Sequence, residues 1–110
     1  LPAELCISLV ERYTDGTRLP GGMVQGLRFE IVAGKPSFRV GAYPDEHADL
    51  IIEISAAAAR TLNRLYSADP QYRIALAALL QSGAMRESGD MTRLGDWLAA
   101  VHDPIVDRTQ

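Results

Sequence analysis

The chain has 110 residues, 47% of them hydrophobic and 23% charged, and a formal net charge of −3. This length is enough for one hydrophobic core, so we expect a single domain over residues 1–110. The negative charge and the absence of a basic stripe argue against a nucleic-acid-binding protein, because neutralising phosphates needs clustered Lys and Arg.

The single cysteine, Cys6, excludes an intramolecular disulfide and a cysteine-rich metal site, and it fits a reducing compartment. The longest apolar run, residues 74–80, is too short to cross a bilayer, and no signal-peptide pattern occurs. We therefore expect a cytoplasmic domain. Because Leu1 is not a methionine, we also expect residues before it to be missing or removed.

The first half of the sequence predicts four β-strands. Apolar residues alternate with polar ones, the period of a half-buried strand, in residues 6–13, 27–31, 37–41 and 50–54. Turn signals rich in Gly, Pro and Asp separate these runs. The turn at Gly34-Lys35 shares its dipeptide with phosphate-binding loops but lacks their preceding glycine and following helix, so we interpret it as a hairpin turn.

Helical periodicity replaces the strand pattern after Ser55, which is a suitable N-cap for a helix over residues 56–66. Asp69 and Pro70 then predict the start of a second helix, with aspartate as the cap and proline at the first helical position. This second helix is apolar on most of its surface, and Gly83 is expected to end it.

The last part of the sequence predicts a short strand, residues 84–88, and a final helix capped by Asp90. One face of this helix is apolar and carries Met91, Leu94, Leu98 and Val101. The order of elements predicts an α+β fold, with a largely antiparallel five-stranded sheet and the helices packed on one face.

Two segments resemble the sterol carrier protein 2 family of lipid-binding domains. Residues 83–90 (GAMRESGD) follow the pattern Gly-x-Φ-x-x-x-Gly-Asp before a helix, and residues 48–55 (ADLIIEIS) form a strand that enters a helix through a serine cap. The resemblance covers residues 29–101. It implies non-enzymatic binding of a fatty acid, an acyl chain or another lipid between the sheet and the C-terminal helices, without a cofactor or a metal.

The resemblance also assigns the residues that line the ligand site. They come from the first two helices, the last strand and the final helix: Leu62, Leu65, Tyr72, Leu76, Leu79, Leu80, Met85, Leu94 and Leu98. From composition alone, the apolar stripe of the second helix favours a plain core, and the resemblance to the family raises the ligand-lining interpretation to equal weight.

Two departures from the family pattern bear on the ligand. Family members usually begin with a long helix, whereas only residues 1–5 precede the first strand here. Glu87 stands where the family generally has an aliphatic residue, and burying an unpaired carboxylate costs several kcal/mol, on the order of 2–7 for a polar group alone. We therefore expect Glu87 at the rim of a cavity, paired with an arginine such as Arg93, or narrowing the cavity. Both departures favour acyl chains over sterols.

No catalytic motif occurs, so we expect no enzymatic activity. The residues around His47 offer four metal-ligand side chains in a loop, which we interpret as solvated, and His102 is interpreted as stabilising the end of the last helix. Trp97 is either a packed boundary residue or a functional one, at a cavity mouth or in contact with a membrane. The alternative function is a protein-interaction or homodimerisation module with a filled core on the same fold.

Overall fold

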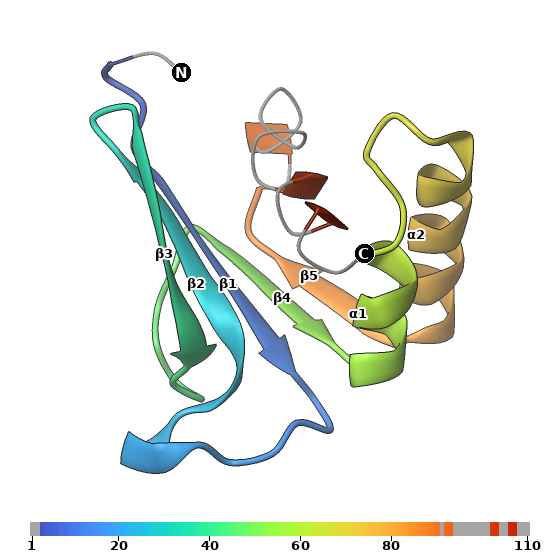
Figure 1. The fold of residues 1–110 in the computed structure, drawn as a ribbon, viewed down its shortest axis with the longest axis horizontal. Coiled ribbons are helices and arrows are strands. Elements are labelled where there is room, and N and C mark those ends of the chain that lie inside the picture. Colours follow the sequence, from blue (N-terminus) through green and yellow to red (C-terminus); the bar gives the residue numbers. More distant parts are fainter. Residues whose placement is uncertain (1–2, 91, 94–101, 104–105, 108–110) are drawn as a thin grey trace.

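The structure is a computed structural model that describes residues 3–90, 92–93, 102–103 and 106–107. In chain order its elements are β1 (Ile7–Tyr13), a short 3-10 helix η1 (Pro20–Gly22), β2 (Val24–Val32), β3 (Lys35–Ala42), β4 (Leu50–Ile54), α1 (Ala56–Leu62), α2 (Pro70–Ser82) and β5 (Met85–Ser88). The helices α1 and α2 lie on one side of a twisted sheet (Figure 1). The α+β class and the five strands are as predicted from the sequence.

The five strands form one sheet in the order β3-β2-β1-β4-β5, and this sheet is mixed. The expectation of a largely antiparallel sheet was wrong, because the pair β1–β4 is parallel while its neighbours are antiparallel. The cause is the connection between β3 and β4. Residues 43–49 form a crossover instead of a hairpin, so β4 runs beside β1 in the same direction.

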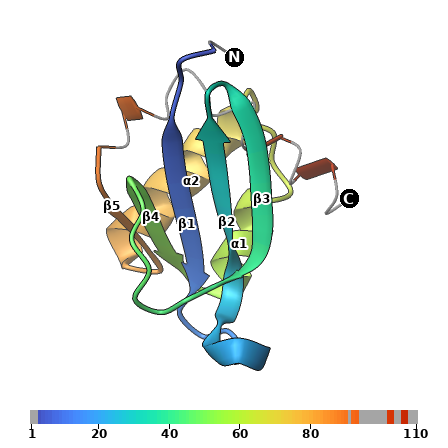
Figure 2. The same ribbon diagram turned by 90° about the vertical axis from the view of Figure 1, so that its left-hand side faces the viewer.

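The crossover passes over the face of the sheet opposite the helices, as Figure 2 shows. Val10, on that face of β1, is fully buried. The carboxylate of Glu46 fixes the crossover to the sheet by accepting hydrogen bonds from Arg28 of β2 and Arg39 of β3. The sheet thus has an outer face, part of which lies under the crossover, and a helix-facing side.

The predicted helix boundaries rest on capping groups that the structure confirms. The Ser55 hydroxyl accepts a hydrogen bond from the Ala58 amide at 3.1 Å. The Asp69 carboxylate accepts one from the Gln71 amide at 2.9 Å, and Gly83 ends α2 in the left-handed conformation with φ of 81°. Helix α1 ends at Leu62 and is therefore shorter than the helix predicted over residues 56–66.

Two groups of buried side chains form the core on the helix-facing side. One joins β4, α1, α2 and β5 and consists of Ile54, Ala58, Ala59, Leu62, Tyr72 and Met85. The other joins β1, β2 and β4 and consists of Ile7, Leu9, Ile31 and Leu50. The partly buried Ile52 packs against both groups and connects them.

The final helix predicted after Asp90 falls mostly on residues 94–101, which lie outside the described residues. At its expected start, the Asp90 carboxylate accepts a hydrogen bond from the Thr92 amide at 3.1 Å, as a cap would. Within the described part of the chain, no helix has the length and apolar character needed to span a membrane.

Candidate functional site

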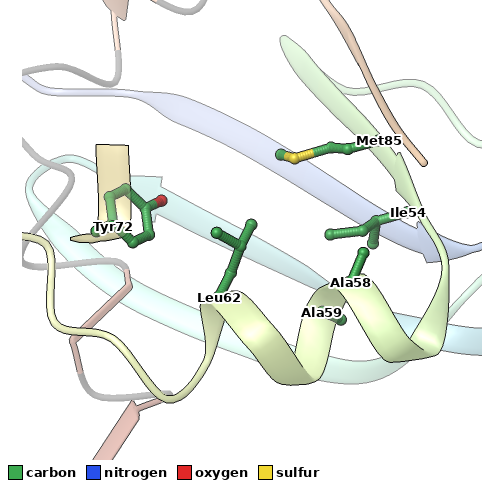
Figure 3. Packing of buried hydrophobic residues seen from close by; sticks show 6 residues of the cluster. All are labelled: Ile54, Ala58, Ala59, Leu62, Tyr72 and Met85. Atoms are coloured by element: carbon green, nitrogen blue, oxygen red, sulfur yellow. The ribbon is translucent and has the colours of Figure 1, made fainter. Parts of the chain in front are cut away.

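The candidate site lies between the helix-facing side of the sheet and the two helices. Leu62 of α1, Tyr72 of α2 and Met85 of β5 point from three elements into the same space (Figure 3). All three are buried, with 4–6% of their surface exposed. Segments far apart in the sequence thus bring apolar side chains together beside β4.

The structure groups most of the described residues that were predicted to line the site. Besides the three buried residues, Leu65, Leu76 and Leu79 are partly buried and pack against the same cluster. Leu80 differs, since 37% of its surface is exposed. It lies one residue after Leu79, so the turn of α2 carries its side chain away from the sheet. The remaining two predicted residues, Leu94 and Leu98, are outside the described residues.

Part of the C-terminal segment belongs to this region. His102 is buried, its Nε2 atom lies 2.8 Å from the carbonyl oxygen of Leu65, and its ring centroid is 4.7 Å from that of Tyr72. Val106 is fully buried. His102 therefore joins this part of the chain to α2 and to the segment before it, and its predicted stabilisation of a helix end stays a prediction.

Glu11 is the residue of this site that sequence reasoning missed. It continues the alternation of Ile7 and Leu9 along β1, so its carboxylate lies on the helix-facing side of the sheet. Its register partners on the neighbouring strands are the apolar residues Leu27 and Ile52. Desolvation by the surrounding protein raises the pKa of Glu11 from 4.5 to about 7. The signal in the sequence was the period of two, which places residue 11 on the same face as residues 7 and 9.

Glu87 of β5 lies on the same side of the sheet as Glu11. Its register partner is Ile52, which is also the partner of Glu11, so Ile52 separates the two glutamates. Glu87 is exposed, and desolvation raises its pKa above the ordinary value. Glu87 thus lies on an outermost strand of the sheet, and its expected place at the rim of a cavity stays a prediction.

Arg86, which precedes Glu87 in the chain, and Arg93 have other partners. The Nη2 atom of Arg86 lies 3.6 Å from Oε2 of Glu53. The Nη1 atom of Arg93 lies 3.7 Å from Oδ1 of Asp49. Within the described residues, neither Glu11 nor Glu87 forms an ion pair.

The negative charges of both glutamates affect the ionisation of the Tyr72 hydroxyl. Burial, followed by the negative charges of Glu11 and Glu87, raises the pKa of its hydroxyl to about 12. The hydroxyl is therefore protonated at neutral pH and points toward the space between α1 and the sheet (Figure 3). The site thus combines an apolar lining with one phenol and two acidic groups.

The acidic loop around His47 is used for structure. Glu46 binds two arginines, and the carboxylate of Asp49 accepts hydrogen bonds from the amide and hydroxyl of Ser8. The backbone carbonyl of His47 accepts one from Arg28. Among the described residues, no three His, Cys, Asp or Glu side chains converge as a metal site would require.

Solved structures with a similar chain path identify the fold. A structure described as sterol carrier protein 2 superimposes with a TM-score of 0.53 over 97% of this chain and 78% of its own, at 16% sequence identity. The protein has the sterol carrier protein 2 fold. A ubiquinone synthesis protein, UbiJ-SCP2, gives a TM-score of 0.54 over 97% of this chain and 70% of its own, at 17% identity.

The same fold also matches part of a much larger protein. The inverting sec-alkylsulfatase Pisa1 from Pseudomonas sp. superimposes with a TM-score of 0.53 at 18% identity, over 83% of this chain. This chain spans only 12% of the length of that sulfatase. No protein-family model matches the sequence, and the comparison with curated proteins gives no match.

Proposed function

We propose that the protein is a non-enzymatic binding domain for an apolar ligand such as an acyl chain or another lipid. The observation that carries the proposal is the convergence of apolar side chains from α1, α2 and β5 beside β4, within a fold shared with sterol carrier protein 2. The ligand would lie against Leu62, Leu65, Tyr72, Leu76, Leu79 and Met85. Leu94 and Leu98 of the C-terminal segment complete the proposed lining.

Burial of the ligand chain would drive binding. Each methylene removed from water contributes about 0.8 kcal/mol, so eight methylenes contribute about 6 kcal/mol before the entropy of association is subtracted. Micromolar affinity is therefore the expected ceiling. Brief contact with a membrane during loading and a cytoplasmic location belong to the same proposal.

A fluorescence titration with a neutral, long-chain probe tests this function. Two variants of α2 form a matched pair: Leu76→Gln changes a residue packed against the core, and Ile74→Gln changes one that is 61% exposed. We expect Leu76→Gln to weaken binding at least tenfold and Ile74→Gln to leave it unchanged. A wild-type protein that does not saturate below about 1 mM probe, where binding is worth only about 4 kcal/mol, would contradict the proposal.

A second candidate function rests on the apolar surface of β3. Val40 is 72% exposed and Phe38 is 50% exposed. Both continue the apolar row of β2, because Phe38 pairs with Phe29 and Val40 with Leu27. Such a row on an outermost strand favours an interaction module or a homodimer. Sedimentation of the wild type and of Val40→Lys distinguishes this alternative, which requires a dimer or partner complex that the lysine disrupts.

A further inference from the structure

Glu11 is an acidic group in an otherwise apolar part of the site. Leu27 and Ile52 flank it on the neighbouring strands. Burial of a carboxylate is costly unless a cation or several hydrogen-bond donors compensate it. Among the described residues, no ion pair or side-chain hydrogen bond reaches its carboxylate.

Glu11 is nevertheless within reach of a small molecule. Part of the surface of Glu11 is exposed to solvent. Protein atoms nevertheless surround its carboxylate closely enough to disfavour the charged form. The carboxylate is thus unpaired and disfavoured as an anion, while part of the residue remains open to solvent. Glu87 is on the same side of the sheet, with Ile52 between the two, and two strand spacings place their backbones about 10 Å apart.

We propose that this site takes an amphiphile with a protonated amine head, held by Glu11 with Glu87 at the rim, and discriminates against fatty-acid anions. The inference rests on the proposed function and specifies its ligand class. The apolar chain would lie against the cluster of Leu62, Tyr72 and Met85.

The chemistry of the head group follows from the unpaired carboxylate. An alkylammonium group supplies both the positive charge and the hydrogen-bond donors that Glu11 lacks. A fatty-acid carboxylate at the same place would add a like charge to two acidic groups in a region of low dielectric. An alcohol of the same chain length can donate one hydrogen bond without charge, so it serves as the neutral reference.

Proton binding to Glu11 gives the proposal a second readout. Titratable and charged groups on the elements packed around Glu11 are Tyr13 of β1, Arg60 of α1, Tyr72 and Arg73 of α2, Glu87 of β5, and His102 and Asp103 of the C-terminal segment. Because the pKa of Glu11 is about 7, its carboxylate becomes fully charged only above neutral pH. Affinity for the amine should therefore increase between pH 6 and pH 8, whereas affinity for the alcohol should not.

The test compares dodecylamine, dodecanol and dodecanoate as competitors of the neutral fluorescent probe at pH 8. The proteins are the wild type, Glu11→Gln, Glu87→Gln and, as a matched control on the outer face of β4, Glu53→Gln. We expect the amine to bind wild type and Glu53→Gln at least tenfold more tightly than the alcohol or the carboxylate. In Glu11→Gln this preference should fall below threefold, with an intermediate loss in Glu87→Gln.

The outcomes separate this inference from the proposed function. If dodecanol and the probe do not bind, the lipid-binding function itself is wrong. If dodecanol binds but dodecanoate binds as tightly as the amine, or the preference persists in Glu11→Gln, only the assignment of an amine head is overturned. An amine affinity that is independent of pH from 6 to 8 in the wild type also overturns it, without reliance on any variant.

Discussion

Ser67 donates two hydrogen bonds to Asp103, from its amide to Oδ1 at 2.9 Å and from its hydroxyl to Oδ2 at 3.1 Å. This pair joins the segment before α2 to the C-terminal segment. Because both residues are partly buried, the bonds are shielded from competing water. The C-terminal segment is thereby fixed at one end of the candidate site.

We expect Asp103→Ala to lower the free energy of unfolding by about 1–3 kcal/mol, because two donors of Ser67 lose their acceptor. Asp107→Ala is the matched control. Asp107 accepts one hydrogen bond from the exposed hydroxyl of Tyr66 at 2.6 Å, so its loss should cost about 0.5 kcal/mol or less. Urea unfolding monitored by Trp97 fluorescence measures both. Equal effects of the two substitutions would contradict the role assigned to Asp103.

The Glu46 carboxylate should make the crossover sensitive to acid. Although burial opposes its ionisation, hydrogen bonds from the Tyr43 amide and from Arg39, together with the charge of Arg28, lower its pKa. A carboxylate with a lowered pKa stabilises the fold above its ordinary value of 4.5, and this contribution disappears as the pH falls through the folded-state value.

Glu46→Gln should therefore destabilise the protein by about 1–2 kcal/mol at pH 7. The difference from wild type should shrink steadily when unfolding is measured between pH 5 and pH 3. Asp45→Asn, an exposed change in the same loop, is the control and should have no effect at either pH. A Glu46→Gln effect that is the same at pH 3 and pH 7 would rule out the charge as its cause.

Gly26 is required by the close approach of β1 and β2. A Cβ atom at this position would lie 2.1 Å from the backbone oxygen of Glu11, much closer than van der Waals contact. We expect Gly26→Ala to cost more than about 2 kcal/mol because the strands must separate. Gly21→Ala is the control: its φ of 79° is unfavourable for alanine, but nothing lies within 4 Å, so about 1 kcal/mol is expected. Chemical denaturation of both variants measures the two losses of stability and shows whether Gly26→Ala is the more destabilising.

Glu11 predicts an unusual dependence of stability on pH. Its pKa is higher in the folded protein than the ordinary 4.5, so folding favours the protonated form. Its stabilising contribution is complete below pH 4.5 and is lost as the pH rises through about 7. The difference between the folded and ordinary pKa values corresponds to at most about 3 kcal/mol of folding free energy. Solvent access to the side chain reduces this contribution.

Glu11→Gln should consequently be more stable than the wild type at pH 8, by about 1–2 kcal/mol, and similar to it at pH 5. Thermal unfolding at both pH values measures the difference. Glu53→Gln changes an outer-face glutamate on the adjacent strand. Its stability relative to wild type should not depend on pH in this way. A Glu11→Gln variant that is less stable than wild type at pH 8 would show that the carboxylate is compensated.

The sequence was most informative where short-range chemistry decides the structure. Ser55, Asp69 and Gly83 identified the helix boundaries because capping depends on a few neighbouring atoms. The alternation of apolar and polar residues located the strands, because successive side chains of a strand point to opposite faces of the sheet. The parallel pairing of β1 with β4 could not be inferred, because it depends on the path of residues 43–49 across the sheet.

The candidate site was predicted in its apolar part and missed in its charged part. Helical periodicity placed Leu62, Tyr72 and Leu76 toward the core, but it also included Leu80, which the exact turn of α2 leaves exposed. Glu11 was overlooked because a charged residue at the end of an apolar alternation is usually at an edge. The pairing of β1 with β2 and β4, which places apolar residues on both sides of Glu11, depends on the fold of the whole sheet.

The bonds between Ser8 and Asp49 have a consequence for synthesis of the chain. These residues are 41 positions apart, and their three hydrogen bonds of 2.9–3.3 Å lie where β1 and β4 begin to pair. β1, the middle strand of the sheet, is synthesised before β4. Its edge toward β4 therefore stays unpaired until residues 50–54 have left the ribosome. Non-local parallel pairing of this kind is slow to form. Until then the nascent chain exposes an unpaired strand edge, the kind of surface that favours aggregation.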